Sequence, residues 1–167
     1  MRFRHRLVVY IALVLAGSTV ATTQRRPSAT RGASGDHVIV DPASITWRPI
    51  PPGWADGPPP AGYSLGQSEV AIIDGDPTKE GVPFVIRFRS APGTQLPPHS
   101  HPIDEHITIL SGVWCVGMGD RFDEHACRDL PAGSYLVIPK GMSHFAVAKG
   151  SVVQLHGIGP FKIHWVK

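Results

Sequence analysis

Charged residues are scarce in this sequence of 167 residues, and no segment longer than one turn repeats apolar side chains at a helical spacing. Only 17% of the residues carry a charge, and without a helical repeat this composition excludes a coiled coil and a helical bundle. The long apolar run at residues 7–17 is shorter than the roughly 20 residues that cross a bilayer. A polytopic membrane protein is therefore excluded as well.

Glycine and proline, in contrast, are abundant, with 18 and 17 copies. Both residue types interrupt regular structure and favour turns. No internal repeat is evident. The sequence therefore predicts one domain that is built from short strands joined by many turns.

The basic charge of the chain is concentrated at its N-terminus. The formal charge is +3 and the pI is near 9.1, which would favour a nucleic-acid or membrane-surface partner. Three arginines precede the apolar run at 7–17, and small residues surround Ala21, so residues 1–21 are predicted to be a secretory signal peptide. An uncleaved anchor is the alternative. Cleavage after Ala21 leaves 13 basic and 13 acidic side chains.

We therefore expect a periplasmic or secreted protein that binds no nucleic acid and keeps no stable membrane anchor after cleavage. Residues 22–36 contain no bulky apolar side chain and are predicted to be a disordered linker. Residues 37–68 form a Pro-rich arm, in which residues 37–40 are a candidate edge strand. Proline at this density forbids a helix or a central strand, so the arm is expected to pack on the surface of the barrel. Trp47 and Trp54 are its expected apolar anchors.

Residues 69–167 read as a series of short strands separated by Gly and Pro. In one of them Phe84 and Ile86 share a face and Arg87 lies on the other, which is the alternation of a half-buried strand. Six to nine such strands favour a sandwich or a small barrel. The predicted strands are 69–74, 82–89, 105–110, 113–118, 134–138, 144–148, 151–156 and 161–166.

Two histidines and a glutamate follow one another in the segment His99-Ser-His101-Pro-Ile-Asp-Glu105. By itself, His-x-His is a weak signal that also fits two surface histidines. Residues i and i+2 of a strand point to the same side, so the two imidazoles can converge on one point. Glu105 and the apolar Ile107 are two residues apart, so they are expected on the same face of a strand. A carboxylate that is buried on this face needs a partner. A metal ion is the simplest partner for this set.

A second stretch supplies a third histidine. The strand before Pro139 runs into a Pro-x-Gly turn, and His144 begins the next strand. Together the two stretches resemble the cupin superfamily, in its single-domain conserved-barrel form. Residues 93–112 match its first motif (Gly, five residues, His-x-His, three residues, Glu, six residues, Gly). Residues 133–144 match its second motif (Gly, five residues, Pro-x-Gly, two residues, His), but Ala148 stands where the family usually has Asn.

The resemblance implies an all-β fold, the jelly-roll barrel or double-stranded β-helix of cupins, over residues 69–167. It also implies that His99, His101, Glu105 and His144 bind one divalent transition metal. This donor set suits Fe, Mn, Ni, Cu or Zn, whereas Ca and Mg prefer oxygen ligands. The implied function is a metal-dependent dioxygenase or related oxidoreductase that acts on a small organic molecule. A non-catalytic module that binds a metal or a small ligand is the alternative. A homodimer is expected through the arm and edge strands.

Three further residues are pocket candidates. Trp114 lies close to the expected mouth of the barrel in sequence. Gln154 and His156 alternate with apolar residues on a late strand, so they are either surface residues or polar groups of the pocket. His106 has the opposite parity to Glu105 and is expected to face outward.

The sequence contains two cysteines. In an exported protein a single pair is best explained as one disulfide, so Cys115 and Cys127 are expected to bridge the loop between the two motifs. A thiolate ligand for a soft metal is the alternative.

Overall fold

A computed structural model describes residues 37–63, 65 and 68–167. The predicted signal peptide (1–21) and linker (22–36) lie outside the described residues. Within the described part, no helix is long and apolar enough to span a membrane.

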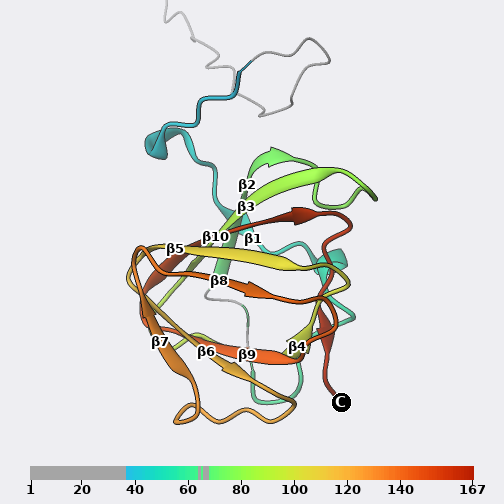
Figure 1. The fold of residues 1–167 in the computed structure, drawn as a ribbon, viewed down its shortest axis with the longest axis vertical. Coiled ribbons are helices and arrows are strands. Elements are labelled where there is room, and N and C mark those ends of the chain that lie inside the picture. Colours follow the sequence, from blue (N-terminus) through green and yellow to red (C-terminus); the bar gives the residue numbers. More distant parts are fainter. Residues whose placement is uncertain (1–36, 64, 66–67) are drawn as a thin grey trace, which may run out of the picture.

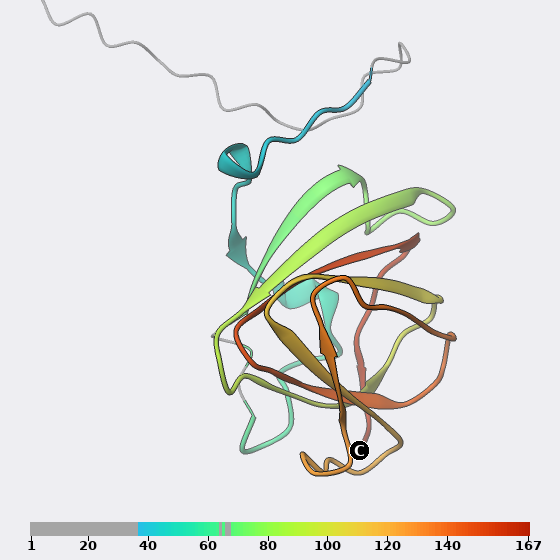
Figure 2. The same cartoon turned by 60° about the vertical axis from the view of Figure 1, so that its left-hand side comes forward.

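Two antiparallel sheets face each other and enclose the core (Figures 1 and 2). The six-stranded sheet has the order β1 (Arg48–Pro49), β2 (Ser68–Gly75), β3 (Pro83–Ser90), β10 (Ser151–Ile158), β5 (Glu105–Ser111) and β8 (Tyr135–Ile138). The five-stranded sheet has the order β11 (His164–Trp165), β4 (Gln95–Ser100), β9 (His144–Ala148), β6 (Val113–Met118) and β7 (Arg128–Pro131). From β4 to β6 and from β7 to β10 the chain changes sheet at every step. This is the winding of a double-stranded β-helix, so the predicted all-β fold is confirmed.

The core lies between the two sheets because strand side chains alternate between inside and outside. Phe84 and Ile86 on β3 are buried and Arg89 is exposed, as the alternation predicts. On β5 the buried positions are Glu105, Ile107 and Ile109. One acidic side chain therefore points into the same interior as the apolar residues.

The turn between β5 and β6 depends on a glycine. Gly112 has a φ of +69°, and a Cβ atom at this position would lie 1.9 Å from the carbonyl oxygen of Gly150. Only glycine combines this backbone conformation with such a close approach. The last glycine of the first motif is thus required by the crossover from one sheet to the other.

Two strands of the five-stranded sheet were not among the predicted strands. β4 contains Pro97 and Pro98, which interrupt the usual strand signal, and its pairing with β9 is irregular between Leu96 and His99. β7 is only four residues long and mostly exposed. Near the C-terminus, the predicted strand at 161–166 is shortened to the two residues of β11.

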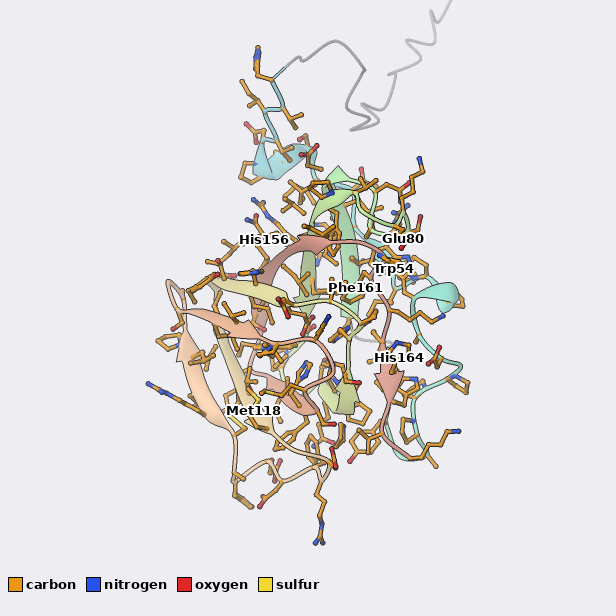
Figure 3. All side chains as sticks on the ribbon, turned by 45° about the vertical axis from the view of Figure 1, so that its right-hand side comes forward. Trp54, Glu80, Met118, His156, Phe161 and His164 are labelled. Carbon is orange, nitrogen blue, oxygen red and sulfur yellow. A yellow bond between two sulfur atoms is a disulfide. The ribbon has the colours of Figure 1, made fainter. Side chains whose placement is uncertain are left out.

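The arm contacts the barrel from residue 47 onward. β1 pairs with β2, and the buried Trp54 packs edge-on against Phe161 at 5.4 Å between ring centroids. Trp47 is half-buried beneath the guanidinium of Arg89. Figure 3 labels Trp54 and Phe161 where the arm meets the C-terminal segment.

Two expectations for the arm were wrong. Residues 37–40 form no strand, because they lie beyond the sheets and have no neighbouring strand to pair with among the described residues (Figure 1). The arm also contains two 3₁₀ helices, η1 (Pro42–Ser44) and η2 (Pro52–Trp54). Each begins with proline, which fits the first turn of a helix because its N–H needs no partner there.

Candidate metal centre

Three buried histidines meet at one end of the barrel. His99 on β4 lies directly opposite His144, the first residue of β9, and their ring centroids are 4.2 Å apart. His101 follows β4, with its centroid 4.9 Å from that of His99. One nitrogen from each ring lies within 4.8 Å of the others, and all three residues are at most 4% exposed. The histidines of both sequence motifs are therefore brought together; we call them the inner cluster.

Glu105 joins the inner cluster from the opposite sheet. Its even spacing from His99 and His101 would place Glu105 on the same face of one continuous strand. Residues 101–104 form a bend, however, so the three residues do not belong to one strand. Glu105 points inward because it begins β5, whose alternation continues with Ile107. A buried carboxylate and three imidazoles thus converge from two facing sheets.

Backbone carbonyls fix the tautomer of each inner histidine. The Nδ1–H groups of His99 and His144 donate to the carbonyls of Pro97 (2.7 Å) and Met142 (3.1 Å). His101 donates in the same way to Lys162 at 2.7 Å. A carbonyl oxygen only accepts, so the proton of each neutral ring lies on Nδ1 and the lone pair lies on Nε2. Such outer contacts orient histidine ligands in metal sites.

The lone pairs of Nε2 face the carboxylate of Glu105. Its oxygens lie 3.3 Å from Nε2 of His101 and 3.2 Å from Nε2 of His144. Among the described residues, Nε2 of His101 and Oε2 of Glu105 are buried without a hydrogen-bond donor. Acceptors that face one another in a dry interior repel unless a cation or a proton lies between them. The site therefore fits a metal ion.

Burial keeps His99 and His101 uncharged at neutral pH. Loss of solvent, and then repulsion by His144, lowers the pKa of His99 to about 3. Burial also lowers the pKa of His101 to well below its usual value, with smaller contributions from His99 and His144. Neutral imidazole is the form that binds a metal. At neutral pH these two rings are therefore ready to act as ligands.

The C-terminal segment supports the site in a way that sequence reasoning did not find. The ring of Phe161 stacks on His101 at 4.9 Å, and Trp165 meets the ring of His99 edge-on at 5.8 Å. Lys162 contributes only its backbone carbonyl to His101, and a backbone group leaves no signal in a sequence. The separation of 61 residues in the chain hides the contact further.

The arm in turn holds the C-terminal segment. Ile163 donates its N–H to the carbonyl of Trp54 (2.7 Å), and Asp56 donates its N–H to the carbonyl of Ile163 (3.0 Å). The carboxylate of Asp56 accepts from Nδ1 of His164 and lies 3.5 Å from Nζ of Lys162. The arm is therefore connected to the inner cluster through two successive contacts.

The pocket candidates occupy different sides of the sheets. Trp114 is buried and lines the cavity next to the inner cluster. Gln154 and His156 face outward: the side-chain oxygen of Gln154 accepts from Arg87 (3.0 Å), and His156 is exposed (Figure 3). Alternation on β10 turns the buried Val153 and Leu155 inward instead. These two polar residues therefore do not line the cavity.

His156 has a histidine neighbour on the outer surface. Its ring stacks on His106 at 5.0 Å between centroids, and the two residues lie opposite each other on β10 and β5. Nδ1 of His106 is 2.7 Å from the hydroxyl of Tyr135. We call His106 and His156 the outer pair. The outward direction predicted for His106 agrees with this placement.

Cys115 and Cys127 form a disulfide, with 5.4 Å between their Cα atoms. It links β6 to the residue just before β7, across the loop between the two motifs. The thiolate-ligand alternative is therefore wrong.

A two-sheet barrel with three histidines and a glutamate inside one end is the architecture of a cupin. Residues 76–162 match the family described as the ChrR cupin-like domain. This region is more than half of the chain, and the protein belongs to this family.

The chain is also similar in sequence or in structure to several known proteins. Germin-like protein 1-1 from Oryza sativa subsp. japonica is 36% identical over 92 residues, which cover 54% of this chain and 42% of that protein. The chain thus matches less than half the length of this curated relative. The polyketide cyclase RemF from Streptomyces resistomycificus has a TM-score of 0.56 at 16% identity, covering 74% of this chain and 80% of RemF. An RmlC-like cupin from Shewanella frigidimarina has a TM-score of 0.51 at 13% identity, covering 74% and 92%. The identities of 16% and 13% with these two solved structures show a shared fold alone.

Proposed function

We propose that this protein is an exported metal-binding cupin and a metal-dependent oxidoreductase of dioxygenase type that acts on a small organic molecule. His99, His101, His144 and Glu105 would hold one divalent ion of Fe, Mn, Ni, Cu or Zn. The observation that carries the proposal is the set of Nε2 and carboxylate acceptors that face one another without a donor.

When bound, such an ion supplies Lewis-acid or redox chemistry to a small ligand. The chain itself supplies the ligand atoms, the carbonyls that orient them and apolar walls that exclude water. Among the described residues that line the cavity, the ionisable ones are the four ligand residues. A general base outside the ligand set is therefore not part of the proposal.

Oxygen consumption tests the catalytic part of the proposal. The protein, purified without a His tag and loaded with Fe, would be assayed with a panel of catechols, thiols and β-diketones. We expect oxygen uptake with at least one class and none with a His99→Ala variant. Absence of turnover with every reconstituted metal would overturn the catalytic proposal.

The second candidate is a non-catalytic module that binds a metal or small ligand outside the cytoplasm. The lack of any further ionisable group in the described cavity lining favours it. Metal content without turnover is the result that this candidate predicts.

The proposal also includes export of the protein from the cytoplasm. The disulfide supports it, because disulfides persist in oxidising compartments. N-terminal sequencing of the native protein should find Thr22 as the first residue. A mature N-terminus upstream of Leu7 would contradict export by a cleaved signal peptide.

A homodimer through the arm is also proposed. β1, which belongs to the arm, lies at an edge of the six-stranded sheet, and an unpaired edge invites pairing with another strand. Light scattering on the purified protein should give twice the mass of the mature chain. The mass of a single chain would contradict it.

A further inference from the structure

The space beside the inner cluster is almost entirely apolar. A cavity of about 50 Å³ lies between the sheets, which is room for about four water molecules. Its polar side chains are the four ligand residues at one end, Ser68 and Ser90 with their hydroxyls, and Trp114 with its indole N–H. The remaining walls are apolar side chains, among them Phe88, Leu96, Ile107, Val153 and Leu155.

No cationic side chain among the described residues lines this cavity. The two arginines in the middle of β3 point to the opposite face, where Arg87 donates to Gln154 and Arg89 pairs with Glu69. A phosphate or a second carboxylate in the cavity would therefore be buried without a partner, which is costly. A polyhydroxylated body would lack partners for most of its hydroxyls.

The charge of the centre allows one anionic group. Three neutral imidazoles, one carboxylate and a divalent ion have a net charge of +1. A single anionic oxygen headgroup neutralises this charge, and any further charge on the ligand is left uncompensated.

The serine pair lies away from the metal end. Ser90 pairs with Ser68 and Ser151 in the sheet, whereas Glu105 lies beside the pairing of His156 with His106, several residues further along β10. The hydroxyls of Ser68 and Ser90 are 2.8 Å apart and satisfy each other. They therefore place no requirement for a second polar group on the ligand.

The serine end also adjoins the arm. Ile50, Leu65 and Ser68 line both the cavity and a groove of about 900 Å³ whose walls include Pro58, Pro59 and Pro60. A ligand longer than the cavity therefore meets another largely apolar surface at this end.

We propose that the ligand of this cupin is an apolar molecule with one anionic oxygen headgroup. The headgroup lies at the metal, and the hydrocarbon body follows the cavity toward Ser68. This inference rests on the proposed metal centre and names the class of molecule that it accepts.

Straight-chain monocarboxylates are the probes. Isothermal titration of butyrate, hexanoate and octanoate into the Zn-loaded protein should show affinity rising about fourfold for each added methylene, because each one is moved from water to an apolar wall. Suberate, with the chain length of octanoate and a second carboxylate, should bind at least about tenfold more weakly than octanoate.

A matched pair of variants locates the binding. Ala146 lines the cavity and is 2% exposed, so Ala146→Leu fills space that the hydrocarbon body needs. We expect it to weaken octanoate binding at least about tenfold, the equivalent of two methylenes or more, without changing Zn content. Ala132→Leu makes the same change at an exposed position and should have no effect. Ala146→Val is the milder form should Ala146→Leu fail to fold.

The outcomes separate this inference from the proposed function. An affinity that does not change with chain length, or equal binding of suberate and octanoate, would overturn the ligand class. If the protein binds no metal but still binds the longer acids more tightly, the proposed metal function is wrong and the apolar ligand body stands.

Discussion

The inner cluster and the outer pair are two groups of adjacent histidines that differ in burial and in hydrogen bonding. Both groups contain rings packed within about 5 Å of each other. In the inner cluster each Nδ1–H donates to a carbonyl, which leaves Nε2 as a free acceptor. In the outer pair His106 contacts a hydroxyl, which donates as well as accepts, so neither nitrogen is fixed as a ligand. Close packing of imidazoles is therefore not enough for a metal site. Fixed tautomers, burial and the facing carboxylate of Glu105 are what make the inner cluster fit a metal ion.

The largest expected effect separates the two groups directly. His144→Ala removes one of the four proposed ligands and should weaken Zn affinity at least about 100-fold, beyond what an outer contact contributes. His156→Ala should leave Zn affinity unchanged, because its ring lies on the outer surface. Isothermal titration with Zn checks both variants. Equal losses in the two would show that the distinction between the groups is wrong.

Glu105→Gln should affect the metal-bound and metal-free states in opposite directions. Replacing the carboxylate by an amide should lower Zn affinity about 10- to 100-fold, because the ligand loses its charge. The amide N–H₂ also donates to the unpaired Nε2 of His101, so the metal-free variant should melt at the wild-type temperature or above it. Titration and thermal unfolding measure the two effects. A less stable metal-free variant would refute the explanation based on facing acceptors.

Asp56→Ala should loosen the inner cluster from a distance. The arm holds the segment that presents the carbonyl of Lys162 to His101, so we expect up to about tenfold weaker Zn binding, the lower end for outer contacts. Asp76→Ala is the matched control, because the side chain of Asp76 is also partly exposed and bonds within its own turn to Thr78. If the variant keeps both the wild-type Zn affinity and the wild-type absorption spectrum of the Co(II)-loaded protein, the contacts of Asp56 do not act on the inner cluster.

The smallest effect concerns the outer pair. Partial burial, and then the neighbouring His106, lower the pKa of His156. NMR titration should find its midpoint below that of an ordinary histidine, and His106→Ala should raise the midpoint because both causes are reduced. A midpoint that moves further down would contradict this account.

Sequence reasoning identified the four side chains that converge in the candidate metal centre, because their chemistry is carried by residue types at fixed spacings. It also found the alternation of Phe84 and Ile86, since burial on one face of a strand appears directly in residue type. It could not decide the direction of Gln154 and His156, because a polar residue on a barrel strand fits both the outer face and a face that lines a pocket.

Other features leave no trace in residue type. β4 was not among the predicted strands because Pro97 and Pro98 argue against one, although the interpretation of His-x-His assumed a strand at His99. The strand orients His99 through the carbonyl of Pro97. The contact between His101 and Lys162 is made by backbone, and the contacts of Asp56 join segments more than 100 residues apart. Such features depend on the folded arrangement of the sheets and the arm.

X-ray absorption of the Zn-loaded, untagged protein tests the central claim most directly. We expect one Zn per chain with three imidazoles and one carboxylate as ligands, and the same spectrum from a His106→Ala/His156→Ala double variant. Loss of Zn from the double variant, or a wild-type shell without three imidazoles, would contradict the assignment of the metal centre to His99, His101, Glu105 and His144.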